Sequence, residues 1–288
     1  MPGAVPAATP IARVRLRDDA SVPALGFGTW HMGEDPARAA QEVAVVAAAL
    51  DAGMTLIDTA EMYGDGGSEE VVGRALAGRP RDDVFVVSKV YPHNAGARSA
   101  AAACEASLRR LGLDHLDLYL LHWRGRIPIA ETVRAFSGLV RDGLVRRWGV
   151  SNFDVGDMED LFAVRGGDEC ACNQVLYNLS ERGAEWRLID WCRGRRVPLM
   201  AYSPIGQGTL LRNRKLAAIA QSLGHTPAQV ALAWTMRHPD VIAIPQTSDL
   251  GHLAEDRAAA NVVLDPAALA ALDVAFPPPR QPTTLSVI

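Results

Sequence analysis

The sequence predicts a (β/α)8 barrel, a closed ring of parallel strands each followed by a helix, formed by residues 1–288 as a single domain. Short apolar runs rich in β-branched residues alternate with helical segments about every 30 residues, which is typical of parallel βα units. A doubly wound nucleotide-binding sheet would instead need the pattern GxGxxG after an early strand. Gly26-Phe-Gly28 lacks the third glycine, and Gly206-Gln-Gly208 comes too late in the chain.

Eight apolar runs are the expected barrel strands, and their near-continuous hydrophobicity indicates burial on both faces. They are residues 24–29, 55–59, 84–90, 116–123, 147–151, 172–177, 197–202 and 241–245. Before them, residues 11–23 have Val14 and Leu16 beside a polar turn. This stretch predicts a short hairpin that closes the N-terminal end of the barrel.

Helical periodicity fills the intervals between the strands, for example at residues 36–52, 68–77, 100–111, 129–142 and 227–238. Three residues predict helix boundaries. Ser68 precedes a Glu-Glu pair and Thr226 precedes a proline, as at helix starts, while Gly112 follows an expected last turn.

Composition restricts the class of partner. With 49% hydrophobic and 22% charged residues the chain can bury a large core, and its net charge of −4 comes without a Lys/Arg block that would track nucleic acid. Met1–Pro10 has no signal-peptide character, and no run of about 18 apolar residues occurs. We therefore expect a cytoplasmic monomer or weak oligomer that binds neither nucleic acid nor membrane, with four reduced cysteines and no metal.

The carboxyl ends of the expected strands carry the candidate catalytic residues, because active sites of such barrels lie at that end. Asp58, Lys89 and His122 each end an apolar run, and a lone buried charge there would cost several kcal/mol, so we expect the three to satisfy one another. A lysine ammonium beside Tyr63 would lower the pKa of its phenol from about 10. Tyr63 is therefore the predicted general acid.

Six motifs in order give this chain a family resemblance: Gly-Phe-Gly-Thr-Trp, Ile-Asp-Thr-Ala-Glu-Met-Tyr-Gly, Val-Ser-Lys-Val, Asp-Leu-Tyr-Leu-Leu-His-Trp, Trp-Gly-Val-Ser-Asn and Ala-Tyr-Ser-Pro. Together they resemble the aldo-keto reductases over nearly the whole chain. Through Val90-Tyr-Pro-His-Asn-Ala-Gly96 and Cys172-Asn-Gln-Val-Leu-Tyr177, the likeness is closest to the bacterial members that reduce methylglyoxal and related small aldehydes. The resemblance implies Asp58, Tyr63, Lys89 and His122 as catalytic tetrad. It also implies hydride transfer from a dihydronicotinamide to a carbonyl carbon while Tyr63 protonates the oxygen.

The same resemblance implies NADPH as the cofactor. Tyr202 would stack on the nicotinamide, and Ser151, Asn152 and Gln174 would hold its carboxamide. Gln246 and His252 stand where the family has basic residues, which makes NADH the alternative cofactor. Helix N–H groups near Ser248 and Asp249 could still bind a phosphate. The full set of implied cofactor contacts is Gly28, Thr29, Trp30, Asp58, Ser151, Asn152, Gln174, Tyr202, Ser203, Pro204, Ile205, Gln207, Gly208, Gln246, Thr247, Ser248, His252, Glu255 and Asp256.

Aromatic residues at the strand ends predict the substrate pocket, with core packing as the alternative for the tryptophans. The expected substrate contacts are Trp30, Tyr63, His122 and Trp123. His93 either lines the mouth of the site or is solvated. The short loop at residues 204–214 and the short tail after Pro279 predict an open site that accepts many small aldehydes.

Two other functions remain open at this point. One is a regulatory subunit that binds the nicotinamide cofactor, reports redox state to a partner and turns over little. The other is a barrel isomerase that uses Lys89 as a Schiff base.

Overall fold

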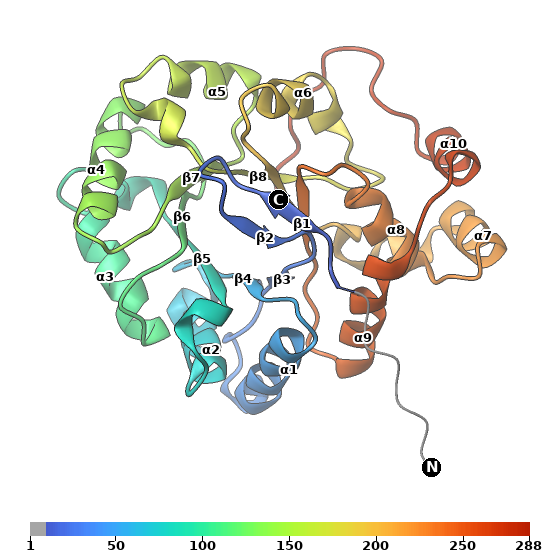
Figure 1. Ribbon diagram of the computed structural model, residues 1–288, viewed down its shortest axis with the longest axis horizontal. Coiled ribbons are helices and arrows are strands. Elements are labelled where there is room, and N and C mark those ends of the chain that lie inside the picture. Colours follow the sequence, from blue (N-terminus) through green and yellow to red (C-terminus); the bar gives the residue numbers. More distant parts are fainter. Residues whose placement is uncertain (1–9) are drawn as a thin grey trace.

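The computed structural model describes residues 10–288, and its centre is a ring of eight parallel strands (Figure 1). The order along the ring follows the order along the chain, so each strand pairs with its sequence neighbours. All eight predicted strands are confirmed, most of them a residue or two shorter than expected. They are β3 (Phe27–Gly28), β4 (Leu56–Asp58), β5 (Phe85–Val90), β6 (Leu118–Leu121), β7 (Trp148–Ser151), β8 (Asn173–Leu176), β9 (Leu199–Tyr202) and β10 (Val241–Ile244).

The first and last strands close the ring. Leu25 and Ala243 form a parallel bridge, and the backbone N–H of Gly26 donates to the Ala243 carbonyl at 2.9 Å. The Gly28 N–H donates to the Pro245 carbonyl at 2.9 Å. A Cβ added at Gly26 would lie 2.7 Å from the Leu56 side chain, so this position needs glycine for the strands to approach.

Ten α-helices surround the strands in the described part of the chain, as Figure 1 shows. The five predicted helical segments are confirmed, and the first begins with a 3₁₀ turn, η1 (Pro36–Arg38). The helices are α1 (Ala39–Asp51), α2 (Gly67–Leu76), α3 (Ala100–Leu111), α4 (Ile129–Arg141), α5 (Val155–Phe162), α6 (Leu188–Arg193), α7 (Arg214–Ser222), α8 (Pro227–Thr235), α9 (Leu250–Ala258) and α10 (Pro266–Ala275). None of the helices in residues 10–288 is long and apolar enough to cross a membrane.

Two of the three predicted helix boundaries are confirmed. Thr226 caps α8 in a capping box with Gln229, and Gly112 ends α3 with a φ of 66°, a conformation that favours glycine. The prediction for Ser68 is wrong, because α2 begins at Gly67 and its N-cap is Gly66. The Ser68 hydroxyl is instead buried and hydrogen-bonds to the hydroxyl of Thr29.

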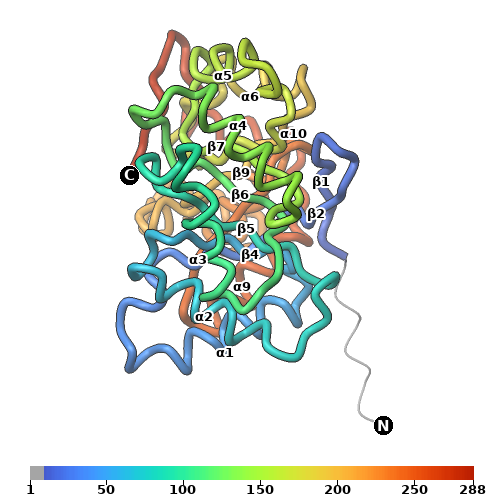
Figure 2. Tube along the Cα trace, turned by 90° about the vertical axis from the view of Figure 1, so that its left-hand side faces the viewer, coloured from blue at the N-terminus to red at the C-terminus, as the bar shows by residue number. Residues whose placement is uncertain are grey.

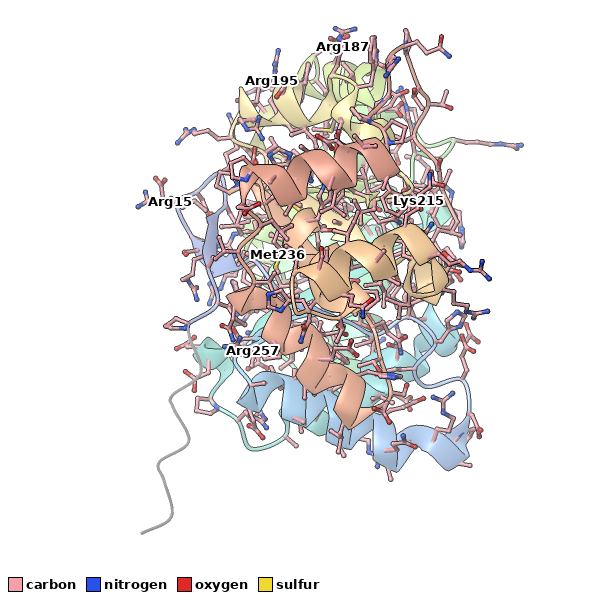
Figure 3. The ribbon with its side chains drawn as sticks, turned by 90° about the vertical axis from the view of Figure 1, so that its right-hand side faces the viewer. Arg15, Arg187, Arg195, Lys215, Met236 and Arg257 are labelled. Carbon is pink, nitrogen blue, oxygen red and sulfur yellow. The ribbon has the colours of Figure 1, made fainter. Side chains whose placement is uncertain are left out.

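The predicted N-terminal hairpin is confirmed as β1 (Arg13–Arg15) paired antiparallel with β2 (Ser21–Pro23). Its apolar side chains, Val14 and Val22, are buried in the cluster that fills the barrel interior, against Leu56, Leu118 and Met200. The hairpin therefore plugs one end of the barrel, and Figure 2 shows it on the side opposite the C-terminus. Figure 3 shows the outer helix layer between them, with Arg15 toward the plugged end and Lys215 toward the other.

Candidate active site

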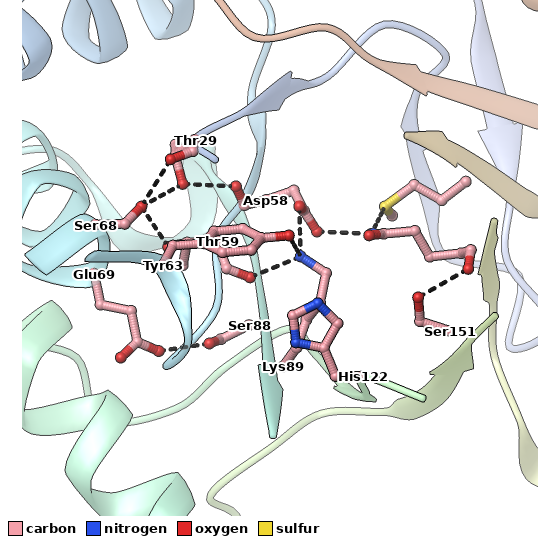
Figure 4. Close-up of polar contacts among 12 residues, drawn as sticks. Thr29, Asp58, Thr59, Tyr63, Ser68, Glu69, Ser88, Lys89, His122 and Ser151 are labelled. Atoms are coloured by element: carbon pink, nitrogen blue, oxygen red, sulfur yellow. Dashed lines mark hydrogen bonds and ion pairs between the residues drawn. The ribbon is translucent and has the colours of Figure 1, made fainter. Parts of the chain in front are cut away.

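A buried hydrogen-bond chain joins three residues at the carboxyl ends of neighbouring strands (Figure 4). Lys89 on β5 donates from Nζ to Asp58 Oδ2 at 2.6 Å and to the Tyr63 hydroxyl oxygen at 3.0 Å. A third bond, to the carbonyl of Thr59, measures 3.0 Å. Asp58 ends β4, and Tyr63 follows it on the 3₁₀ turn η2 (Tyr63–Gly66), so pairing of β4 with β5 brings the three together.

Gln174 on β8 completes the contacts of Asp58 from across the barrel. Its Nε2 donates to Asp58 Oδ1 at 2.8 Å, while Ser151 Oγ donates to the Gln174 backbone carbonyl at 2.9 Å. Both carboxylate oxygens of Asp58 are therefore bonded in the barrel interior. The family resemblance implied a cofactor role for Gln174 and no role toward Asp58.

The pKa of Tyr63 shifts in the direction opposite to the expectation. Burial raises the pKa of the Tyr63 phenol, and the opposing effect of Lys89 is smaller, so the predicted lowering is wrong. Burial also lowers the pKa of Lys89, but the attraction of Asp58 and Tyr63 outweighs it and the net pKa is raised. Tyr63 is thus a protonated hydroxyl beside a charged ammonium at neutral pH.

His122 lies beside the hydrogen bonds of Asp58, Lys89 and Tyr63 and takes no part in them. Its ring meets the Tyr63 ring edge-on with centroids 5.8 Å apart, and its Nδ1 is buried with no hydrogen-bond partner among residues 10–288. Burial, with Lys89 nearby, lowers the pKa of His122 to about 3. The expectation that Asp58, Lys89 and His122 satisfy one another therefore holds for the first two and is wrong for His122, which is a neutral imidazole.

A cavity of about 1180 Å³ opens above the Asp58–Lys89–Tyr63 hydrogen bonds and runs over the carboxyl ends of the strands. Asp58, Tyr63 and His122 line it, as does most of the sequence-predicted cofactor set. The predicted residues on its wall, besides these three, are Gly28, Trp30, Trp123, Ser151, Asn152, Gln174, Tyr202, Ser203, Pro204, Ile205, Gln207, Gly208, Gln246, Thr247, Ser248 and His252.

Four predicted site residues do not line the cavity. Lys89 is fully buried and reaches the cavity only through Tyr63 and Asp58. Thr29 is buried behind the wall, where its hydroxyl donates to the Asp58 carbonyl at 2.9 Å. Glu255 and Asp256 lie on later turns of α9, and burial raises the pKa of Asp256 to about 7.

Sequence reasoning missed ten wall residues, which come from several parts of the chain. The loop after β3 and the start of α1 contribute one group, and two residues come from far apart in the chain, Leu211 and Ile288. The position of the loop after the first strand was the available signal, since loops at this end of a barrel form the site. The missed residues are His31, Glu34, Asp35, Arg38, Gln41, Met62, Leu211, Ile244, Asp249 and Ile288.

The wall fits an extended dinucleotide. Sites for drug-sized ligands measure about 300–1,000 Å³, and this cavity is larger. Tyr202 forms part of the wall beside Asn152, to which its hydroxyl donates at 2.9 Å. Asn152 has a φ of 62° and Ser203 a φ of 47°, left-handed conformations that aim these residues at the cavity and that persist where the surroundings enforce them.

At the predicted phosphate end, one backbone N–H of α9 is already bonded within the protein. Asp249 caps α9, and its carboxylate accepts the backbone N–H of His252 at 2.9 Å. That N–H is therefore not available to a phosphate, and the cap itself adds a negative charge to the cavity wall.

Trp30 and Trp123 line the cavity as predicted, and Trp123 is 38% exposed. The ring of Tyr91 meets Trp123 edge-on at 5.9 Å, and His93 stacks on Tyr91 at 5.0 Å. Tyr91 and His93 therefore support Trp123 from outside the cavity rather than lining it.

Comparison with known proteins identifies relatives that cover nearly the whole chain. The model of the Aldo/keto reductase family matches residues 24–275. Methylglyoxal reductase YeaE from Escherichia coli (strain K12) is 50% identical over 96% of this chain and 98% of its own, and glyoxal reductase from Bacillus subtilis (strain 168) is 37% identical over 81% and 82%. The crystal structure of an aldo-keto reductase from Klebsiella pneumoniae in complex with NADPH superposes with a TM-score of 0.94 at 49% identity, covering 96% of this chain and 99% of that one.

Proposed function

This chain belongs to the aldo/keto reductase family and is an NADPH-dependent carbonyl reductase, and on that basis we propose that methylglyoxal and related small aldehydes are its substrates, with Tyr63 as proton donor. The observation that carries the proposal is the hydrogen-bond chain from Asp58 through Lys89 to the Tyr63 hydroxyl on the floor of the cavity. In this hydrogen-bond chain Tyr63 is placed to donate a proton, and Lys89 and Asp58 support it.

When bound, NADPH supplies the hydride that adds to the carbonyl carbon. Tyr63 donates its proton to the carbonyl oxygen, and the Lys89 ammonium at 3.0 Å stabilises the phenolate that remains. Asp58 keeps Lys89 charged and oriented, because its carboxylate raises the pKa of that lysine against the effect of burial. The three residues act as one unit in which only Tyr63 exchanges a proton with substrate.

His122 has a different part in the proposal. Because its pKa is about 3, it enters the reaction as a neutral ring that lines the cavity beside Tyr63. A neutral imidazole can donate one hydrogen bond, and we assign that bond to the substrate carbonyl oxygen. Trp30 and Trp123 would enclose the rest of a small aldehyde.

The residues at this end of the cavity would hold the nicotinamide. Tyr202 would supply a ring face, and Asn152, Ser151 and Gln174 would supply polar groups for the carboxamide. Further along the wall, the remaining contacts would come from Gly28, Ser203, Pro204, Ile205, Gln207, Gly208, Gln246, Thr247, Ser248 and His252.

The regulatory and isomerase functions have less support than carbonyl reduction. None of the proteins named above points to a regulatory subunit. A Schiff-base isomerase needs a free amine, whereas the Lys89 ammonium donates hydrogen bonds to Asp58, Tyr63 and Thr59 and has a raised pKa. Lys89 is therefore a charged support and not a nucleophile.

The proposal also covers the organisation and location of the chain. We assign residues 1–288 to a single barrel domain that works as a monomer or weak oligomer. The cytoplasm is the proposed compartment, since the four cysteines lie as buried free thiols, the usual state of cysteine in a reducing environment.

The decisive experiment follows absorbance at 340 nm with methylglyoxal as oxidant and with NADPH and NADH supplied in parallel. Oxidation of NADPH that depends on methylglyoxal and saturates with it is the expected result. Tight cofactor binding without oxidation, over a panel of small aldehydes, would contradict the proposal.

A further inference from the structure

The cavity carries an unbalanced set of charges. Among the described residues on its wall, Arg38 is the one lysine or arginine, whereas Glu34, Asp35, Asp58 and Asp249 are acidic. NADPH brings a pyrophosphate and a 2′-phosphate, and a phosphate monoester alone carries about −1.5 to −2 charges at pH 7. A permanent cation on this wall would offset part of that charge.

The place of Arg38 decides which phosphate it can reach. Arg38 ends η1, immediately before α1, and Gln41 one turn later donates from Nε2 to the Ser248 carbonyl at 2.7 Å. Helical residues three apart share a face, so Arg38 lies on the face of α1 that meets the loop before α9. His252 of α9 lines the same cavity. This is the end away from the Tyr63 floor, where the nicotinamide must lie on the proposed function, so the adenosine phosphates belong here.

The Arg38 guanidinium is available to a ligand. Its side chain is 50% exposed, and its ion pair within residues 10–288 is a loose one with Glu42 Oε1 at 3.8 Å. The other carboxylate oxygen of Glu42 accepts the Gly33 N–H at 2.8 Å, so Glu42 is tied to the loop after β3. A guanidinium can therefore present its planar fork to a phosphate, a geometry that gives two parallel charge-assisted bonds.

The facing segment cannot supply the charge. After β10 the wall continues as Gln246, Thr247 and Ser248, which are neutral, and then Asp249, which is acidic and uses its carboxylate to cap α9. We propose that Arg38 binds the 2′-phosphate of NADPH and thereby sets the preference of this enzyme for NADPH over NADH. This inference rests on the proposed function, because it takes the cofactor orientation from the position of Tyr63.

The test compares Arg38→Gln with Arg109→Gln. Arg109 is a matched control, since it is an exposed helical arginine with a similar loose pair to Glu105 at 4.0 Å, on α3. For each protein, dissociation constants for NADPH and NADH are measured by quenching of tryptophan fluorescence, because Trp30 and Trp123 line the cavity. Calorimetry with 2′,5′-ADP and 5′-AMP then isolates the 2′-phosphate without any turnover.

The expected result is that Arg38→Gln weakens binding of NADPH and 2′,5′-ADP about tenfold and leaves NADH and 5′-AMP unchanged, while Arg109→Gln changes none of the four. Unchanged NADPH affinity in Arg38→Gln, or equal losses for NADPH and NADH, would overturn the assignment of Arg38 alone. Failure of the unsubstituted protein to bind either dinucleotide would instead overturn the proposed function.

Discussion

Gln174 on β8 donates a hydrogen bond across the barrel to Asp58 on β4, with 2.8 Å between Nε2 and Oδ1. Lys89 donates a hydrogen bond to the other oxygen, so both oxygens of the Asp58 carboxylate are hydrogen-bonded. Asp58 itself is 2% exposed. The barrel interior thus holds an ion pair that is almost completely shielded from water, and we expect both stability and turnover to depend on it.

Removing one charge of the Asp58–Lys89 pair should destabilise the protein far more than removing both charges together. Lys89→Met leaves the Asp58 carboxylate buried without its cation, and we expect a loss of about 3–5 kcal/mol in the free energy of unfolding. The double variant Asp58→Asn with Lys89→Met removes both charges and should recover most of that loss while turnover stays absent. Urea unfolding and NADPH oxidation measure the two quantities, with Lys215→Met as an exposed control; a double variant no more stable than the single one would contradict this reasoning.

Tyr63→Phe should separate proton transfer from cofactor binding. The substitution removes one hydroxyl from the floor of the cavity and leaves Lys89 paired with Asp58. We expect kcat for methylglyoxal reduction to fall by about 10²–10⁴-fold, with NADPH affinity within about twofold of the unsubstituted protein. Tyr91→Phe, outside the cavity, is the control. Near-normal turnover in Tyr63→Phe would remove this residue from its assigned role.

Asp256 should make stability fall as pH rises. Its pKa is raised to about 7 by burial in the folded protein, against about 3.9 in the unfolded chain. Below about pH 4 it is protonated in both states; between there and pH 7 only the unfolded chain gives up its proton, so folding loses stability over that range. Asp256→Asn should therefore be more stable than the unsubstituted protein by about 4 kcal/mol at pH 8 and nearly equal to it at pH 4.

Urea unfolding at the two pH values measures this difference, and Glu159→Gln on the exposed face of α5 controls for the loss of an acidic charge. An Asp256→Asn effect that is the same at both pH values would show that the carboxyl does not titrate in this range.

Ile288 should restrict the size of the aldehyde. It lines the cavity together with Tyr202 and Leu211, and Ser286 ties the same segment to Glu181 with a hydrogen bond of 2.6 Å. Ile288→Ala opens that part of the wall, so we expect kcat/KM for a bulky aromatic aldehyde to rise about threefold relative to methylglyoxal. Ile288 is 66% exposed, so its truncation removes no packing from the core. An unchanged ratio of the two kcat/KM values would place the substrate away from this residue.

The sequence predicted those parts of the site that local patterns and barrel topology control. Asp58, Tyr63 and Lys89 lie at strand ends or just after them, and pairing between successive strands brings them together without further information. Ile288 was missed because its place on the wall depends on contacts between segments far apart in the chain, whereas Arg38 directly follows the loop after β3, whose position was the available signal.

The sign of the Tyr63 pKa shift and the isolation of His122 were also beyond sequence reasoning. At Tyr63 burial opposes the neighbouring ammonium and outweighs it, whereas at His122 burial and the ammonium both lower the pKa. Residue order does not give the depth of burial on which both outcomes depend.

The bridge between Leu25 and Ala243 has a consequence for synthesis on the ribosome. Translation delivers β3 near the beginning of the chain and β10 near its end, so a nascent chain that has emerged through β9 holds a sheet with two unpaired edges. Closure waits for residues 241–245, and the cavity can only form after that. Until the last strand emerges, those two edges stay open to pairing with another chain.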